Sequence, residues 1–419
     1  MPARPDVLII GAGVIGLSAA HAALARGLTV QVVDRTGPAA GASAGNAGGF
    51  AFSEIQPLAS PETLLKSPRW LLDPLGPLSI PPRYAARIAP WMARFACASL
   101  PHRVAASTRA QASLMNLGRE TLEPLMAATG TLPMLRKTGQ IAVYESIKAF
   151  DAACRAHDEA RQFGFSYRPL VGSDAIAEVQ PGLSPRFSHA TFTEDWWAIA
   201  DPKLYVLALA GEFRAKGGEI DTGNVRAITP EDWGAVAHLD DGRSLRAGRI
   251  VLAAGAHSHL IARTLGDRIP LETERGYNTT LPPGAFDLRC HITFADHGFV
   301  AAPLSTGIRI GGAVELGGLD LPPNYARSRA MLKKAQAFLP GLDPEGGTEW
   351  MGFRPSLPDT LPAIGRASKT PAVIYAFGHG HLGLTQSTAT ATLVAHLLTG
   401  AAPRIDLAPF SPARFKGLP

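Results

Sequence analysis

The residue in this chain that is best suited to hold an anion is Arg354, in the segment GFRPSLPDTLPAIG. A guanidinium presents a planar pair of donors that matches both oxygens of a carboxylate, so Arg354 is predicted to bind a substrate carboxylate. Its neighbours Phe353 and Pro355 give an apolar context, in which an unpaired charge would be costly. The alternative role for Arg354 is a structural ion pair.

Tyr277, in the segment ERGYN, is a candidate for a second carboxylate ligand, or for a wall of the same pocket, through its phenol. The alternative is a core tyrosine whose hydroxyl finds a partner inside the protein, which is a common arrangement. No carboxylate pair and no Ser/His/Asp set stands out in the sequence as machinery for acid–base or nucleophilic catalysis.

A glycine cluster near the amino terminus, VLIIGAGVIG at 7–16, predicts a dinucleotide site. Gly11 permits a tight turn, Gly13 lets a pyrophosphate approach the backbone, and Gly16 lets the helix from Val14 pack against the strand before it. The helix start then offers its amides to the phosphates. The next strand, 29–33, ends at Asp34, whose carboxylate is placed to accept hydrogen bonds from ribose hydroxyls and disfavours a 2′-phosphate.

The stretch GPAAGASAGNAGG at 37–49 favours FAD over NAD as the dinucleotide. It is a loop of small hydroxyl, amide and glycine side chains directly after Asp34, where an extended cofactor would pass toward the interior. A flexible linker is the alternative, because Gly and Ala without charges also make linkers. The strand RIVLAAGAHS at 249–258 also ends in small residues, which let the backbone pass close to a bound cofactor.

A second glycine cluster, AFGHGHLGLT at 376–385, lies between an apolar strand and the last predicted helix. If this loop crosses the flavin edge, backbone amides from His381 to Leu384 and the positive helix end would stabilise negative charge on the reduced ring. His379 and His381 flank Gly380, and each has the alternative of a turn residue that hydrogen-bonds locally.

The elements that must position these residues follow from hydrophobic periodicity and capping signals. Helices are predicted at about 147–163, 201–217, 323–338 and 384–398, residues 53–130 are Pro-punctuated and helical, and 271–315 carry strands of a separate sheet. Together they predict an α/β fold: a discontinuous Rossmann-like FAD-binding domain with an inserted α+β substrate domain of mixed or antiparallel sheet plus helices. The FAD-binding domain is assigned to 1–60, 170–260 and 350–419, and the substrate domain to 61–169 and 261–349, with a helical insertion at about 61–130.

Composition limits the class of protein. The chain has 419 residues and is 46% hydrophobic, so it can bury a large core in about two domains. No apolar run reaches the roughly 18 residues of a membrane span, and the early first strand leaves no room for a signal peptide. The three cysteines lack metal-ligand spacing, so no metal site is expected, and a cytoplasmic location is expected.

The net charge of +5 is concentrated in residues 64–110, which carry seven basic residues against one acid. The same segment contains Trp70, Trp91 and Phe95, and a basic, aromatic element of this kind can rest on the anionic inner face of a cell membrane. The alternative is a surface insertion whose apolar side packs on its own protein. No nucleic-acid-binding module accompanies the charge, so no nucleic-acid partner is expected.

In order and spacing, VLIIGAGVIG, GASAGNAGG, VLAAGAHS, GFRPSLPDTLPAIG and GHGHLGLT resemble the FAD-dependent D-amino-acid oxidase superfamily over nearly the whole chain. Among its members, the small-subunit type of bacterial D-amino-acid dehydrogenase and its D-hydroxyproline-oxidising relatives are most similar, because they share the helical insertion and GFRPSLPD. The resemblance implies that Arg354 binds the carboxylate of an amino acid. It also implies that hydride passes from the α carbon to flavin N5, leaving an imino acid.

The predicted catalytic residues are Arg354, Tyr277 and His381. The predicted cofactor-binding residues are Gly11, Gly13, Val14, Ile15, Gly16, Asp34, Arg35, Ser43, Asn46, Ala47, Gly48, Val225, Ala254, Gly255, Gly380, His381, Gly383, Leu384 and Thr385. Because no cysteine follows Cys290, FAD is predicted to be noncovalent.

The predicted substrate is a small amino acid, with D-proline and D-hydroxyproline as cyclic candidates, and the electrons are expected to leave to a quinone or a protein carrier. One alternative is an oxygen-using oxidase of glycine, sarcosine or another secondary amine. Another is a flavoprotein subunit of a larger dehydrogenase that docks through residues 64–110, and an NAD-dependent dehydrogenase is the remaining one.

Overall fold

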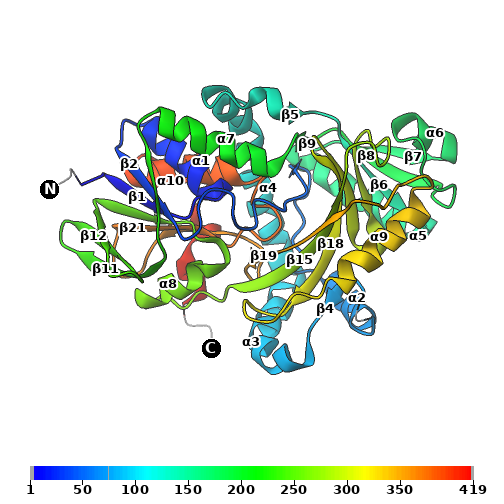
Figure 1. Cartoon of the computed structure of the whole chain (residues 1–419). Helices are drawn as coiled ribbons and strands as arrows, with labels where there is room; N and C mark the ends of the chain where they lie inside the picture. The colour runs from blue at the N-terminus through cyan, green and yellow to red at the C-terminus, as the bar shows by residue number, and fades with distance from the viewer. Residues whose placement is uncertain (1–3, 74, 417–419) are drawn as a thin grey trace.

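The computed structural model describes residues 4–73 and 75–416, which form two lobes side by side (Figure 1). The predicted ranges 1–60, 64–110 and 350–419 include residues 1–3, 74 and 417–419, which lie outside the described residues. Each lobe is built on one large β-sheet, and the described chain begins at residue 4 and ends at residue 416 on the first lobe.

The first lobe contains a six-stranded sheet in the order β10-β2-β1-β14-β21-β20. Neighbouring strands from β10 to β21 are parallel, and β20 runs antiparallel to β21. The strands are β1 (Val7–Ile10), β2 (Val30–Asp34), β10 (Glu219–Thr222), β14 (Arg249–Leu252), β20 (Ala363–Arg366) and β21 (Val373–Phe377). The sheet draws on three separated segments of the chain, which confirms the predicted α/β fold with a discontinuous Rossmann-like sheet.

Both faces of this sheet are covered, which explains the uninterrupted apolar run of β1. Val7 and Ile9 belong to the core shared with the helices on one face, which are α1 (Val14–Leu24), α7 (Pro202–Ala215) and α10 (Ser387–Thr399). Leu8 and Ile10 point the other way, because successive strand residues alternate between faces. They pack against α8 (Ser258–Thr264) and a small antiparallel sheet of β11 (Val225–Glu231), β12 (Gly234–Leu239) and β13 (Ser244–Ala247).

The second lobe contains a nine-stranded mixed sheet in the order β19-β15-β18-β17-β16-β6-β8-β7, with β4 paired to β18. Its strands are β4 (Leu78–Ser79), β6 (Gln140–Tyr144), β7 (Arg168–Val171), β8 (His189–Thr193), β15 (Glu272–Leu281), β16 (His291–Phe294), β17 (Phe299–Leu304), β18 (Gly307–Leu316) and β19 (Thr348–Ser356). α9 (Ala326–Phe338) buries Met331 and Phe338 in the core of this lobe, to which α6 (Ser173–Val179) adds Ile176. α5 (Ile147–Ala160) packs Phe150 beside Tyr144 of β6.

Strand pairing moves two borders of the predicted FAD-binding domain. β7 and β8 pair with each other and with β6, so the segment that begins at residue 170 starts in the nine-stranded sheet. β19 likewise pairs with β15, although it lies within the predicted range 350–419. A short strand carries no local signal of which sheet it joins. For that reason the predicted ranges 170–260 and 350–419 include strands of the nine-stranded sheet. We therefore place the proposed borders near residues 200 and 357.

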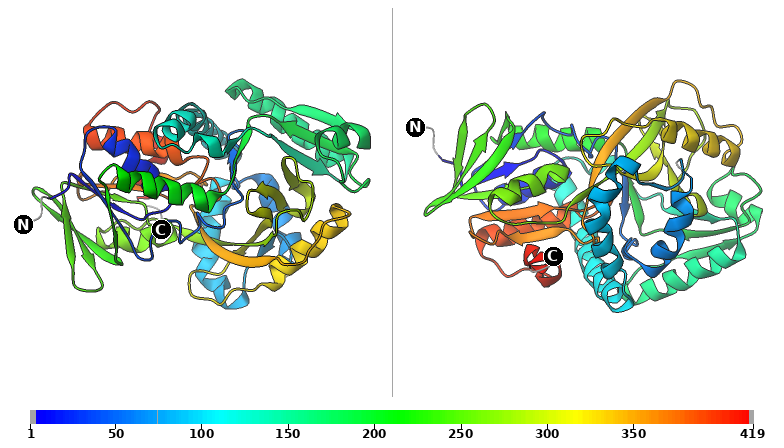
Figure 2. Two further views of the ribbon diagram at one scale, coloured as in Figure 1. Left: turned by 45° about the horizontal axis from the view of Figure 1, so that its top comes forward. Right: turned by 90° about the horizontal axis from the view of Figure 1, so that it is seen from below.

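The predicted helical insertion is occupied by α2 (Pro61–Leu71), α3 (Pro82–Ala98) and α4 (Pro101–Ala128), each beginning at a proline, as proline at the first helical turn favours. α4 packs on α10 of the first lobe, and α3 packs beside β18 of the second, so the insertion contacts both (Figure 2). Within the described residues no helix is both long enough and apolar enough to cross a bilayer.

Candidate active site

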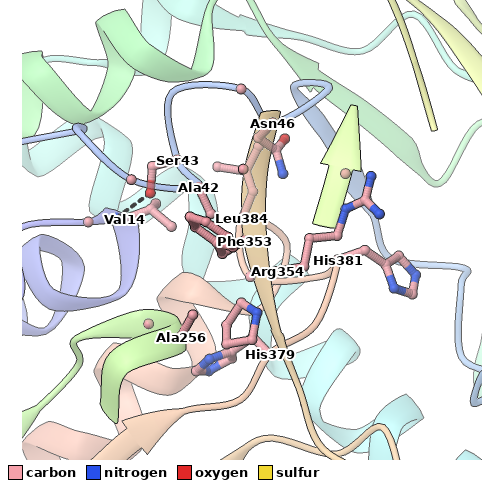
Figure 3. A pocket seen from close by; sticks show the side chains of 18 of the residues that line it. Val14, Ala42, Ser43, Asn46, Ala256, Phe353, Arg354, His379, His381 and Leu384 are labelled. Atoms are coloured by element: carbon pink, nitrogen blue, oxygen red, sulfur yellow. Dashed lines mark hydrogen bonds between the residues drawn. The ribbon is translucent and has the colours of Figure 1, made fainter. Parts of the chain in front are cut away.

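A cavity of about 680 Å³ lies where the two lobes meet, and its walls come from both large sheets. All the residues predicted to bind the cofactor or the substrate line it, apart from Gly16 and Gly48. In Figure 3, Val14 and Ser43 lie at one end of the cavity, with Arg354 and His381 at the other. The predicted residues therefore gather at one place, although they are spread along nearly the whole chain.

The glycines of the turn between β1 and α1 are fixed by close backbone approaches. Gly11 has φ +112°, and a Cβ there would lie 2.3 Å from the carbonyl oxygen of Ala253. A Cβ on Gly16 would lie 1.9 Å from the carbonyl oxygen of Gly11. Gly16 thus packs beneath the turn instead of lining the cavity, as its predicted role in helix–strand packing requires. This turn leaves the backbone open toward the cavity, which fits a dinucleotide pyrophosphate.

Asp34 organises the backbone around this turn. One carboxylate oxygen accepts a hydrogen bond from Ala12 N at 2.8 Å, and the other accepts from Thr36 N and Gly37 N at 2.9 Å. The carboxylate also lines the cavity, where its remaining acceptor capacity is available to ribose hydroxyls. Beside it, Arg35 Nη1 lies 2.7 Å from His257 Nε2, and burial together with the charge of Arg35 lowers the pKa of His257 to about 4.

The loop at 43–49, which we call the cofactor loop, is fastened to both lobes. Ser43 Oγ accepts a hydrogen bond from Val14 N at 3.1 Å, at the start of α1. From the second lobe, Asn278 Nδ2 donates to Gly45 O at 3.0 Å, and Arg309 Nη1 donates to Ala44 O at 3.3 Å and to Asn46 O. The loop leads into β3 (Gly49–Ala51), which forms a small sheet with β9 (Trp196–Ile199) and β5 (Leu135–Arg136).

Gly48 does not line the cavity, and a Cβ added to it would lie 3.0 Å from Leu304 Cδ2 and 3.2 Å from the carbonyl oxygen of Ile199. Its φ of +76° favours glycine, so this residue shapes the cofactor loop from behind. The prediction that Gly48 lines the cofactor site is therefore corrected to a supporting role.

The loop before α10 offers backbone donors to the cavity. Gly380 has φ +54° and donates to Pro355 O at 2.8 Å, which ties the loop to the end of β19. Among the described residues, the amides of Gly383 and Leu384 donate no hydrogen bond, and both residues line the cavity. His379 Nε2 instead lies 2.9 Å from Thr390 Oγ1 of α10, and burial lowers the pKa of His379 to about 3. The predicted role of the backbone amides is thus compatible with the geometry, and His379 is a buried structural residue.

Arg354 extends from β19 across the nine-stranded sheet. Its register partner on β15 is Glu274, and a Cβ on Gly276 would lie 2.4 Å from its guanidinium. The guanidinium donates one hydrogen bond, to Ala313 O at 3.2 Å, and forms no ion pair among the described residues. Burial lowers the pKa of Arg354 and the charge of Glu274 opposes this change, but an arginine stays protonated. The arrangement leaves a partly satisfied cation facing the cavity.

Tyr277 does not face Arg354. In the pairing of β15 with β19, Gly276 and Arg354 share one face, so the side chain of Tyr277 lies on the other face. Its hydroxyl donates to Glu315 Oε2 at 2.5 Å and accepts from Asn324 N at 3.0 Å. Burial and the Glu315 carboxylate raise the pKa of Tyr277 to about 12, against the hydrogen bond from Asn324. This geometry does not fit the phenol as a second carboxylate ligand. Tyr277 does line the cavity, so its predicted alternative role as part of the pocket wall stays a prediction.

His381 pairs with a residue that the sequence did not single out. Its Nε2 lies 3.2 Å from Glu54 Oε1, and both side chains line the cavity. Burial lowers the pKa of His381, but the charge and hydrogen bond of Glu54 outweigh it and raise the pKa overall. Burial likewise raises the pKa of Glu54, and His381 lowers it overall. Both shifts favour the carboxylate form of Glu54 and the imidazolium form of His381.

Two further parts of the cavity wall were missed. Glu274, on β15, stands in the run LETERGYNTT as a charged residue within a strand, which is a weak signal for a site. At another part of the wall, His291 lies 5.9 Å from Trp196 between ring centroids, and neither Nε2 of His291 nor Nε1 of Trp196 has a partner among the described residues. Burial lowers the pKa of His291 to about 4, so the ring is neutral at physiological pH.

The comparisons with known proteins agree with this geometry. Residues 6–397 match the family model described as FAD dependent oxidoreductase. The chain is 33% identical to a D-amino-acid oxidase of Bradyrhizobium diazoefficiens, over 99% of this chain and 100% of that protein. It is 28% identical to a D-amino acid dehydrogenase of Rhizobium johnstonii, over 96% of this chain and 97% of that protein.

Among solved structures, the fold is similar to a glycine oxidase from Geobacillus kaustophilus, with a TM-score of 0.78, 22% identity and coverage of 99% of this chain and 100% of that one. It is also similar to an L-proline dehydrogenase from P. horikoshii, with a TM-score of 0.76, 19% identity and coverage of 99% of both chains. At these identities the solved structures support the fold alone.

Proposed function

The chain belongs to the family of FAD dependent oxidoreductases, and on that premise we propose that it oxidises the Cα–N bond of a D-amino acid to an imino acid. The observation that carries the proposal is Arg354, a half-buried cation on the cavity wall whose guanidinium has one hydrogen bond and no ion pair among the described residues. Such a group is suited to the carboxylate of an amino acid.

Each part of the chain has a stated task in this proposal. The turn at Gly11 and Gly13, the cofactor loop and the amides of Gly383 and Leu384 hold FAD, which supplies a hydride acceptor at its N5 atom when bound. Arg354 fixes the substrate carboxylate, so that the α carbon is held in one place and the reaction becomes effectively unimolecular. The wall of the cavity excludes water, and the free amides offer fixed donors to developing negative charge.

The choice of a D-amino acid rests on the relatives, which are named D-amino-acid oxidase and D-amino acid dehydrogenase. Cyclic substrates, D-proline and D-hydroxyproline, are included in the proposal. The decisive experiment is anaerobic bleaching of the flavin absorbance of the purified protein with D- and L-amino acids and N-methylated amines. We expect bleaching by one or more D-amino acids. Bleaching by glycine or sarcosine alone would replace the proposal with an amine oxidase.

For the electron acceptor, we propose a quinone or a protein carrier. The rival is oxygen, which the relative named as an oxidase supports. Comparing dye-linked activity with peroxide release distinguishes the two. Fast peroxide release at the rate of substrate oxidation would favour oxygen and remove the carrier from the proposal.

The helical insertion is the proposed contact surface for a membrane or a partner subunit. Leu65 and Leu72 are 82% and 86% exposed, whereas Trp91 and Phe95 pack inward beside β18. Trp91 and Phe95 thus belong to the core, and the exposed leucines with the basic residues of α3 remain for an anionic lipid surface. Co-sedimentation with vesicles of anionic lipid, with Leu65→Ser/Leu72→Ser as the comparison, tests this contact.

We also propose that FAD is noncovalent, because Cys97, Cys154 and Cys290 are all absent from the described residues that line the cavity. Acid precipitation should release the flavin into the supernatant. Flavin that stays with the pellet would contradict this.

A further inference from the structure

Glu274 is a buried carboxylate that has no hydrogen-bond or ion-pair partner in the part of the chain that the structure describes. Its side chain belongs to a residue that is 5% exposed, and Oε2 is buried with no hydrogen bond. Among the described residues, no hydrogen bond or ion pair reaches either of its oxygens. An ionised carboxylate in such a place is costly unless a cation or a donor meets it. Apart from the more distant Arg354, the described residues place no cation or donor against it, although the residue lines the cavity.

The position of Glu274 places this carboxylate beside the proposed carboxylate clamp. Glu274 and Arg354 are directly opposite in the antiparallel pairing of β15 and β19, and such pairs have Cβ atoms about 5 Å apart on one face of a sheet. The guanidinium leans over Gly276, the next residue of β15 on that face. A molecule held by Arg354 therefore lies against Glu274.

The other charged groups around Glu274 are already engaged. His381, which lies close enough for its pKa to respond to Glu274, is paired with Glu54. Glu272, two residues earlier on the same face of β15, accepts a hydrogen bond from Tyr84 Oη at 2.9 Å. On the opposite face, Arg275 pairs with Glu315 at 3.1 Å. Arg354 remains as the counter-charge of Glu274, and it lies farther away than an ion pair.

We propose that Glu274 binds the amino group of the substrate and accepts its proton. The inference deepens the proposed function and rests on it. An α-amino group is one bond from the α carbon, as is the carboxylate held by Arg354, so neighbouring anionic and cationic side chains match the two charges of an amino acid. The proton passes from the ammonium nitrogen to a Glu274 oxygen. When bound, FAD would supply the acceptor for the hydrogen and electron pair of the Cα–H bond. The nitrogen lone pair that Glu274 frees by taking the proton would then form the C=N bond.

A structural role, in which Glu274 only neutralises Arg354, makes a different prediction. If Glu274 acted through Arg354, its loss would change the binding of every carboxylate. If it binds the amino group, its loss would weaken the binding of amino acids. The binding of the matching carboxylates that lack the nitrogen would be unchanged. The two roles are therefore separable with one variant and matched ligands.

The experiment uses the FAD-loaded protein and its Glu274→Gln variant, with Glu272→Gln as the control on the same strand face. Flavin reduction is followed by anaerobic stopped flow from pH 6 to 10, with D-alanine and D-proline. Propionate and cyclopentanecarboxylate, which lack the nitrogen, are titrated by their perturbation of the flavin spectrum. We expect the reduction rate of Glu274→Gln at pH 7 to fall about 100-fold, the range of a lost general base. It should recover as the pH rises and the amine loses its proton in solution.

The binding of propionate and cyclopentanecarboxylate should be unchanged in Glu274→Gln, and Glu272→Gln should match the wild type throughout. A Glu274→Gln variant that reduces as fast as the wild type, or one that loses both ligand sets equally, overturns the inference and leaves the proposed function standing. A wild type that no amino acid reduces overturns both. If Glu274→Gln does not fold, Glu274→Leu, which replaces the lone carboxylate by an apolar group, is tested in the same way.

Discussion

The two ends of the cavity are built from different materials. At the end beside β1, much of the surface is backbone, made accessible by Gly11 and Gly13 and by the small residues of the cofactor loop, with the Asp34 carboxylate at its margin. At the end beside β19, it is a set of charged side chains, Arg354, Glu274 and the Glu54–His381 pair. The first end suits a ligand of fixed shape, because main-chain amides offer the same donors whatever side chains the loop carries. The second suits a ligand chosen by its charges.

This difference predicts which end of the cavity can be substituted without loss of the fold or of FAD. A substitution of a glycine at the backbone end would place a side chain against main-chain atoms. It should therefore abolish folding or FAD binding. A change at the charged end should leave the fold and the cofactor in place and alter ligand binding. The following predictions test that contrast, beginning with the largest effect.

Gly11→Ala and Gly16→Ala should each abolish FAD binding or folding, because the new methyl carbon would lie 2.3 Å and 1.9 Å from a carbonyl oxygen. The measurement is the flavin content of the soluble protein. Gly211→Ala in α7 is the control, since an added Cβ would meet nothing within 4 Å beyond the backbone of its own helix, and it should be neutral or stabilising by up to about 1 kcal/mol. A fully flavin-loaded Gly16→Ala would refute the backbone argument.

Arg354→Leu should keep its fold and FAD content while substrate binding weakens by roughly 2 to 5 kcal/mol, because a cation that pairs with a buried carboxylate is lost. KM from dye-linked activity, or the dissociation constant from anaerobic reduction, measures the effect. Arg354→Lys should be intermediate, since an ammonium cannot form the bidentate pair. Unchanged kinetics in flavin-replete Arg354→Leu would remove Arg354 from the substrate site.

Tyr277→Phe should lower the stability by about 1 kcal/mol without changing KM, since its hydroxyl bonds Glu315 and Asn324 on the face away from Arg354. Thermal unfolding and substrate titration measure the two effects. A KM raised tenfold or more would restore the phenol as a substrate ligand.

Glu54→Gln should reduce stability in a limited pH window. The raised pKa of His381 means that its contribution is complete below about pH 6.5, its unfolded value, and is lost as the pH rises through the folded value. The lowered pKa of Glu54 means that its own contribution is lost as the pH falls below about 4.5 through the folded value. The difference in Tm from the wild type should therefore be largest between about pH 5 and 6.5.

The size of that effect should be about 1 kcal/mol or less, because the pair is partly open to solvent. A difference in Tm that grows toward pH 9 would show that the pair does not carry the charges assigned to it.

The parts of this protein that the sequence predicts are those with local causes. The turn at Gly11, the cofactor loop and the loop at Gly380 each need glycine or small side chains for reasons that lie within a few residues. Arg354 could be predicted because few side chains offer two parallel donors for a bidentate interaction with a carboxylate.

The parts that the sequence does not reveal depend on pairing between distant segments. Glu54 reaches His381 across 327 residues, and Glu274 becomes informative only once β15 is paired with β19. The same pairing decides the face of Tyr277, since a shift of one residue would turn its phenol toward Arg354. The borders at 170 and 350 were displaced for this reason too, because β7, β8 and β19 could join either sheet by their local pattern.

The fastening of the cofactor loop by Asn278 and Arg309 has a consequence for how the protein is made. These bonds join residues 233 and 265 positions apart, so the loop cannot be held until most of the chain has left the ribosome. An amino-terminal fragment would keep the glycine turn but would lack the hydrogen bonds from Asn278 and Arg309 that hold the cofactor loop. We therefore expect FAD to bind stably only after residues 278 and 309 have been made, and a chain that ends before them to be colourless.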